Sequence, residues 1–128
     1  MTTIVVAAAL IERGGRFLIT RRQQGVHLEG LWEFPGGKCD TGESHQACLA
    51  RELREELDVI SSVGEQIFET THTYPELHVE LHFYSCELLS EPAPQLGQEM
   101  RWASREELAE LKFPAADAEL IERLVKKV

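Results

Sequence analysis

Three glutamates that could carry phosphoryl-transfer chemistry lie close together near the middle of the chain: Glu52, Glu55 and Glu56. On a helix, residues three and four apart share one face, with about 5–6 Å between their Cβ atoms. Like charges at that spacing repel, so a bound cation would stabilise them. Mg²⁺ is usually held by one or two carboxylates together with water and substrate phosphates. The cluster therefore indicates either a Mg²⁺ site for a phosphorylated substrate or a solvated, highly charged helix face.

The spacing around this cluster favours the chemical interpretation. Residues 36–59 read GGKCDTGESHQACLARELREELDV, which resembles the Nudix box, and residues 17–37 resemble the MutT branch of that family. One position departs from the pattern, because Asp58 stands where the family usually has glycine. Aspartate tolerates a left-handed helix cap better than most residues, so we expect a small stability cost and unchanged chemistry. The matching positions are Gly37, Glu43, Arg51, Glu52, Leu53, Glu55, Glu56 and Val59.

The resemblance implies one Nudix domain over residues 1–128, folded as an α/β/α sandwich with a mixed central β-sheet. It implies a hydrolase that uses Mg²⁺, or Mn²⁺, to cut a nucleoside triphosphate into the monophosphate and diphosphate. Water would attack the β-phosphorus, and Arg51 would orient a neighbouring glutamate. Glu52 would either ligate the metal or act as the base, and Glu43 would either brace the loop against the helix or ligate metal. Gly37 would have a structural role in the box. The implied metal ligands are the Gly36 carbonyl, Glu52, Glu55 and Glu56.

Residues outside the box complete the implied site. Without the resemblance, Arg22 would be interpreted as a surface cation and His27 as a loop histidine. The family often supplies a further metal ligand six residues before a tryptophan, but here Leu96 stands six residues before Trp102. Glu99 is the nearest carboxylate, and it either substitutes for that ligand or is a solvated residue. The implied substrate-binding residues are Arg22, His27, Glu33, Phe34, Pro35, Gly36 and Asp117.

Asp117 bears on which base is recognised. Relatives that cleave 8-oxo-dGTP often have asparagine here, which both donates to and accepts from the oxidised guanine. An ionised aspartate only accepts and suits an exocyclic amino group, whereas a protonated one imitates asparagine. A structural alternative is that Asp117 caps the final helix. We expect clearance of mutagenic 8-oxo-dGTP, which serves DNA repair and replication fidelity, with CTP or 5-methyl-dCTP pyrophosphohydrolysis as the alternative.

Two alternatives come from other functional classes. The chain could be a non-catalytic Nudix-like module that senses a nucleotide, or a small α/β interaction domain with an acidic helix. A sensor would be expected to have lost box carboxylates, whereas Glu52, Glu55 and Glu56 are all present. Metal-dependent turnover separates these three interpretations.

The predicted elements place the box between strands and at the start of a helix. Apolar spacing predicts a helix that begins after Ser44 and ends at Leu57. Alternating Val79, Leu81 and Phe83 predict a half-exposed strand. We expect a mixed sheet with helices packed on its faces. The remaining expectations are a hairpin of buried strands over 5–11 and 16–20, a strand over 100–103, a short helix capped by Ser104, and a last helix from about Ala116.

Composition limits the class of protein. The 128 residues fit one domain with a hydrophobic core, and no apolar stretch reaches the length of a membrane span. A net charge of −9 argues against binding a nucleic-acid polymer but allows a small phosphorylated ligand with bridging cations. No obligate protein partner is evident. The three cysteines show no CxxC spacing, so we expect a cytoplasmic protein with neither disulfide nor zinc.

Overall fold

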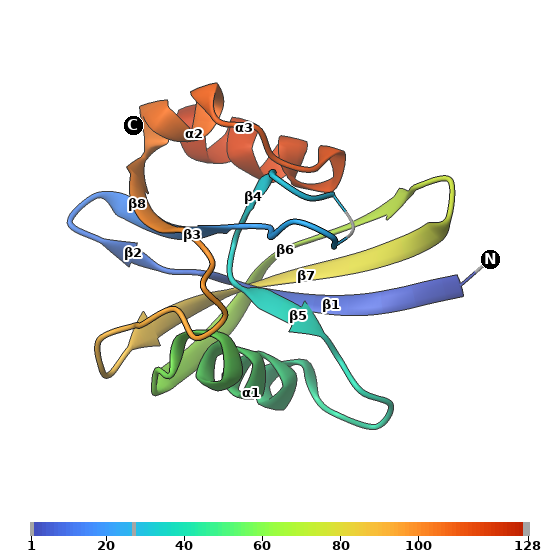
Figure 1. Cartoon of the computed structure of the whole chain (residues 1–128), viewed down its shortest axis with the longest axis horizontal. Coiled ribbons are helices and arrows are strands. Elements are labelled where there is room, and N and C mark those ends of the chain that lie inside the picture. The colour runs from blue at the N-terminus through green and yellow to red at the C-terminus, as the bar shows by residue number, and fades with distance from the viewer. Residues whose placement is uncertain (1, 27, 127–128) are drawn as a thin grey trace.

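Two four-stranded sheets with helices on either side form the computed structural model, which describes residues 2–26 and 28–126 (Figure 1). The first sheet has the order β5-β1-β7-β6, and in the second β3 lies between β8 and β4 with β2 as its hairpin partner. The elements are β1 (Thr2–Leu10), β2 (Glu12–Arg13), β3 (Arg16–Arg21), β4 (Trp32–Glu33), β5 (Gly36–Lys38), α1 (His45–Leu57), β6 (Ser61–Thr73), β7 (Leu77–Leu88), β8 (Met100–Ser104), α2 (Arg105–Glu110), the 3₁₀ turn η1 (Ala115–Asp117) and α3 (Ala118–Lys126).

The first sheet is mixed, as predicted, because β1 runs parallel to β7 and antiparallel to β5. At its centre, Ala7 and Ala9 pack with the buried side chains of α1, whereas Ala8 packs in the core that includes α2 and α3. This period of two puts helices against both faces of the strand. Figure 1 accordingly shows α1 on one side of the sheet and α2 with α3 on the other. The expected α/β sandwich is thus confirmed.

The predicted hairpin is only partly right. Glycines at 14 and 15, with φ of 58° and 77°, turn the short β2 into β3, but β1 itself pairs with β5 and β7 in the other sheet. The chain leaves β1 after Leu10, and Ile11 then accepts a hydrogen bond from the Leu18 amide at 3.0 Å. Apolar patterning identifies buried strands but carries no information on which distant strand each one joins.

Helix α1 begins and ends where the sequence predicts. The Ser44 hydroxyl accepts a hydrogen bond from the Ala47 amide at 3.1 Å, which satisfies one of the free amides of the first turn. Asp58 ends the helix in the left-handed conformation, with φ 49° and ψ 44°. The predicted capping box at Ser104 is also present, with the Glu107 carboxylate accepting from the Ser104 amide at 2.9 Å. The last helix starts at Ala118, after η1.

The expectation that the chain has no disulfide is wrong. Cys39 and Cys48 form one, with 5.2 Å between their Cα atoms, and Cys86 is a buried free thiol. Cys39 follows β5 and Cys48 lies in α1, so only the docking of the helix against the strand brings them together. Cysteine count and spacing contain no trace of that contact. Within residues 2–26 and 28–126, no helix is long and apolar enough to span a bilayer.

Candidate active site

A cavity of about 330 Å³ brings together residues from both sheets, from α1 and from the C-terminal segment. Its apolar wall includes Ile4 and Val6 of β1 and Leu81 and Phe83 of β7. Apolar walls with a few converging polar groups are typical of small-molecule sites, where the polar groups set orientation and specificity. The charged residues in the lining are Arg22, Glu33, Lys38, Glu52, Glu56 and Asp117.

Two glycines let β5 approach its neighbours closely. A Cβ at Gly36 would overlap the backbone of Ala7 and Ala8 in β1, and one at Gly37 would overlap the Glu52 carboxylate. The register of β1 with β5 sets these contacts, because Ala8 pairs with Gly36 and Ala7 with Gly37. The glycine pair thus allows the strand and the α1 carboxylate to meet at the edge of the cavity.

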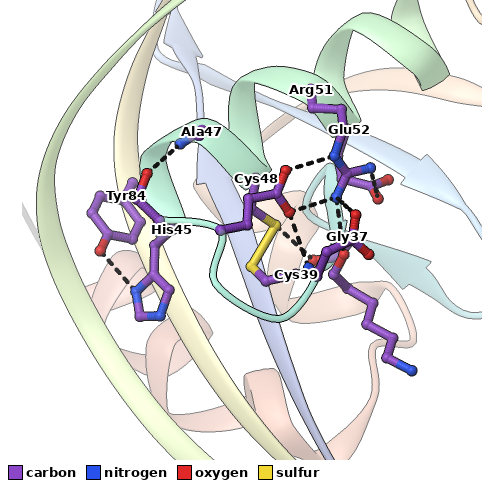
Figure 2. The surroundings of a disulfide bond; sticks show 12 residues. Gly37, Cys39, His45, Ala47, Cys48, Arg51, Glu52 and Tyr84 are labelled. Carbon is purple, nitrogen blue, oxygen red and sulfur yellow. Dashed lines mark hydrogen bonds and ion pairs between the residues drawn. A yellow bond between two sulfur atoms is a disulfide. The ribbon is translucent and has the colours of Figure 1, made fainter.

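Arg51 organises the acidic residues around it. Its Nη1 donates to Glu52 at 2.9 Å and to Glu55 at 3.2 Å, and its Nη2 donates to the Lys38 carbonyl at 3.3 Å. Its Nε and Nη2 donate to Glu43 at 2.8 and 2.9 Å. These bonds, followed by one from the Asp40 amide, lower the pKa of Glu43 to about 2. The pKa of Arg51 is raised in turn, chiefly by Glu43. Figure 2 shows Arg51 and Glu52 above Gly37.

Glu56 and Glu52 both line the cavity, and their side chains are hydrogen-bonded to each other. Burial raises the pKa of Glu56 to about 9, with further contributions from its hydrogen bond to Glu52 and from the charges of Glu52 and Glu33. Two hydrogen-bonded carboxyl groups are a set of hard oxygen donors that suits a divalent cation. Among the described residues, no three Asp, Glu, His or Cys side chains form a complete metal site. A cation here would therefore complete its shell with water and phosphate oxygens, as Mg²⁺ usually does.

A second set of charged residues in the cavity is an ion pair beside a buried acid. Arg22 Nη1 lies 2.8 Å from Glu33 Oε1, and burial raises the pKa of Glu33 although Arg22 partly opposes the rise. Asp117 is only 5% exposed. Burial, followed by the charge of Glu33, raises the pKa of Asp117 to about 7, against the effect of Arg22. The pKa of Asp117 thus lies near neutral pH, and Asp117 lines the cavity.

The structure does not bring all the predicted site residues to the cavity. Glu55 has a side chain that is 55% exposed and bound to Arg51, and Glu99 is exposed and paired with Arg21 at 3.4 Å. Pro35 is fully buried, and its carbonyl accepts a hydrogen bond from Ala9. His27 lies outside the described residues. The predicted residues that do line the cavity are Arg22, Glu33, Phe34, Gly36, Gly37, Glu52, Glu56 and Asp117.

The sequence did not single out the other residues of the lining, among them Leu28, Lys38 and Tyr74. Lys38 directly follows the pair Gly36–Gly37. A lysine beside two glycines could have been interpreted from the sequence as a residue that contacts phosphate. Leu28 has a positive φ of 59°, which is uncommon for a non-glycine residue, and no local pattern predicts it. Tyr74 reaches the cavity from the turn between β6 and β7, where its amide donates to the Leu77 carbonyl at 2.8 Å.

Comparison with known proteins shows which family this chain is similar to. The profile described as "NUDIX domain" matches residues 6–123. An 8-oxo-dGTP diphosphatase from Haemophilus influenzae is 36% identical over 126 residues, covering 97% of this chain and 93% of the relative. A CTP pyrophosphohydrolase from Escherichia coli is 35% identical over 123 residues, covering 95% and 91%.

Solved structures of similar fold indicate the same family as the relatives found by sequence. The ORF135 protein of E. coli superimposes with a TM-score of 0.83 at 35% identity, covering 95% of this chain and 88% of that one. The MutT protein from Methanosarcina mazei Go1 gives a TM-score of 0.86 at 26% identity, covering 96% and 93%. The similarity therefore spans nearly the full length of both partners.

Proposed function

Because this chain belongs to the NUDIX domain family and is a Nudix hydrolase of the MutT type, we propose that it hydrolyses a nucleoside triphosphate to the monophosphate and diphosphate. The whole chain would act as one domain. The observation that carries the proposal is the hydrogen-bonded carboxyl pair of Glu52 and Glu56, in the same cavity as the Arg22–Glu33 ion pair. This arrangement offers cation ligands in one part of the cavity and, among the apolar residues, space for the nucleobase of the substrate.

The residues divide the chemistry between them. Glu52, Glu56 and the Gly36 carbonyl would hold Mg²⁺, or Mn²⁺, which when bound neutralises charge on phosphate oxygens. Glu52, fixed by Arg51, would accept a proton from the water that attacks the β-phosphorus. The bond between that phosphorus and the oxygen bridging to the α-phosphorus breaks, so the monophosphate leaves with that oxygen. Lys38 would pair with the phosphates.

Two proposed metal ligands would need to move. Glu55 reaches the same cation only if it leaves Arg51, to which it is now bound at 3.2 Å. Glu99 would have to give up Arg21 and bring its loop toward the cavity, whose lining does not include it. We therefore assign the first metal contacts to Glu52 and Glu56, and leave Glu55 and Glu99 as ligands recruited with the substrate.

For the nucleobase of the substrate, we favour oxidised guanine, with cytosine as the alternative. A protonated Asp117 both donates and accepts, which matches the N7–H and O6 of 8-oxoguanine, and its burial favours that form. The ionised form suits the amino group of cytosine. The relatives support both substrates at nearly equal identity, 36% and 35%. The biological role would be removal of mutagenic nucleotides from the cytoplasmic pool, in the service of DNA repair.

The deciding experiment measures diphosphate release with Mg²⁺ from 8-oxo-dGTP, dGTP, CTP, 5-methyl-dCTP and 2-hydroxy-dATP. We expect turnover that EDTA abolishes and that Mg²⁺ restores, fastest with 8-oxo-dGTP. Fastest release from CTP or 5-methyl-dCTP would instead favour the cytosine alternative. Nucleotide binding without release from any of the five would contradict hydrolysis and favour a sensor.

A further inference from the structure

The Cys39–Cys48 disulfide joins the two segments that carry the candidate site (Figure 2). Cys39 directly follows β5, which supplies the glycine pair, and Cys48 lies one helical turn before Glu52 in α1. The bond closes the loop of residues 39–48, which contains Glu43, the partner of Arg51. Its Cα separation of 5.2 Å falls in the ordinary range for a disulfide.

The bond also lies directly beside the groups that position the carboxylates. Cys48 Sγ is 3.7 Å from the carbonyl oxygen of Gly37, the residue whose missing side chain makes room for Glu52. On the same segment, the Lys38 carbonyl accepts a hydrogen bond from Arg51 at 3.3 Å. A change in how tightly residues 39–48 are held therefore acts on Gly37, Arg51 and Glu52 together.

We propose that Cys39 and Cys48 are a reversible redox pair that controls this site: the disulfide holds the loop in the working arrangement, and its reduction loosens the loop. The effect on turnover rests on the hydrolase function proposed above. The effect on the loop does not, because it follows from the position of the bond alone.

The exposure of the three cysteines favours exchange at this pair. Cys39 is partly exposed, whereas Cys48 and Cys86 are buried. Burial raises the pKa of Cys86 to about 11, so that thiol is a poor nucleophile at neutral pH. An external thiol thus meets Cys39 first, and Cys86 stays outside the exchange.

The chemistry needs only a small disulfide, such as oxidised glutathione, as the oxidant. The Cys39 thiolate attacks one sulfur of it, which forms a mixed disulfide and releases one small thiol. The Cys48 thiolate then attacks the Cys39 sulfur, which forms the protein disulfide and releases the second thiol. The two cysteines lose two electrons and two protons, and the small disulfide gains them.

The test compares protein equilibrated with oxidised glutathione and with dithiothreitol. After unfolding and alkylation, we expect one label on the oxidised chain, at Cys86, and three on the reduced chain. Reduction should lower the Tm by roughly 5–10 °C, the range for losing a short-loop disulfide. It should also speed hydrogen exchange in residues 39–51 and slow diphosphate release several-fold. Cys39→Ser should behave as the reduced protein in both buffers, and Cys86→Ala should keep the full response.

Three results would overturn the proposal. Three labels after treatment with oxidised glutathione would mean that the bond does not form in solution. One label with equal hydrogen exchange in both states would mean that the bond does not hold the loop. A redox response that persists in Cys39→Ser would move the switch elsewhere. If neither state hydrolyses any nucleotide, the proposed function fails, while label count, Tm and hydrogen exchange still decide on the redox pair.

Discussion

Arg51 donates hydrogen bonds to both carboxylate oxygens of Glu43, from Nε at 2.8 Å and from Nη2 at 2.9 Å. The same guanidinium reaches Glu52 with Nη1 at 2.9 Å. Bidentate pairs between arginine and a carboxylate are stronger and more directional than single hydrogen bonds between neutral groups. One side chain of α1 thus fastens the preceding loop and sets the position of a cavity carboxylate. Glu43 therefore acts on the site through Arg51, without lining the cavity.

The Glu43–Arg51 pair should give the fold a pH dependence in the acid range. The pKa of Glu43 is about 2 in the folded chain, against an ordinary value of 4.5. Its stabilising effect is then fully present above about pH 4.5 and is lost as the pH falls toward 2. We expect Glu43→Gln to have a lower Tm at pH 7 and to approach the wild-type Tm by about pH 2. Glu65→Gln, at an exposed position of β6, is the matched control. A Tm difference that does not change with pH would contradict this.

Glu52 should matter for chemistry more than for folding. Replacing Glu52 with glutamine keeps the shape of the side chain but removes the proton acceptor. We expect Glu52→Gln to lower kcat by about 10²–10⁴-fold, the usual range for losing a general base. Far-UV circular dichroism should remain that of the wild type. Turnover like the wild type in this variant would remove Glu52 from its proposed role, and Glu65→Gln again serves as the control.

Glu56 should release a proton when a divalent cation binds. With a folded pKa of about 9, Glu56 is protonated at pH 7, and a ligating carboxylate must be ionised. Calorimetric titration with Mg²⁺ at pH 7, in buffers that differ in ionisation enthalpy, should report release of about one proton per cation bound. Release should fall toward zero above about pH 9, and in Glu56→Gln. Proton-free binding by the wild-type protein at pH 7 would show that the cation does not displace this proton.

The same pKa predicts how the metal-free fold responds to alkali. A carboxyl group whose pKa is raised on folding favours the folded state below its ordinary value of 4.5. That stability is lost as the pH rises from 4.5 through about 9. The Tm of the EDTA-treated protein should therefore fall across this range, and added Mg²⁺ should restore part of it at the upper end. The Glu56→Gln variant should show a weaker decline.

The sequence was sufficient for features that depend on neighbours along the chain. Helix α1, its Ser44 cap and the left-handed Asp58 follow from local residue preferences, and the structure has all three. The positions of Glu52 and Glu56 followed from helical periodicity. The same periodicity did not predict the direction of the Glu55 side chain. Relative to Glu52, Glu55 (i+3) and Glu56 (i+4) lie on opposite sides of the helix face. Glu56 turns into the cavity, and Glu55 turns outward to Arg51.

Features that depend on distant contacts could not be read from the sequence. The cavity brings Asp117 near Arg22 and Glu33, and the chain order of these residues contains no sign of their proximity. The Cys39–Cys48 bond likewise depends on how α1 docks on β5. Burial decides the protonation of Asp117 and Glu56, and burial exists only once the sheets and helices are assembled.

The helix cap at Asp58 offers a stability test away from the cavity. Its φ of 49° lies in the left-handed region, where glycine has no steric cost. We expect Asp58→Gly to raise the free energy of unfolding by roughly 0.5–1 kcal/mol in urea titration, with kcat unchanged. Asp58→Ala is the control and should lower it, because alanine pays the left-handed cost without the polar side chain. Destabilisation by glycine would mean that the aspartate side chain itself holds the cap.

Asp117 offers the sharpest test of base recognition. An aspartate that titrates near pH 7 presents a donor and an acceptor below that pH and only acceptors above it. The wild-type ratio of kcat/KM for 8-oxo-dGTP over CTP should therefore fall as the pH rises through about 7. Asp117→Asn should raise this ratio at pH 8 by about tenfold or more, since an unmatched buried polar group costs roughly 1–3 kcal/mol, and should flatten its pH dependence. Asp58→Asn, at a helix cap outside the cavity, is the control. A ratio that the Asp117 substitution leaves unchanged would remove this residue from base recognition, and the Arg22–Glu33 pair would be the next polar group of the cavity to test.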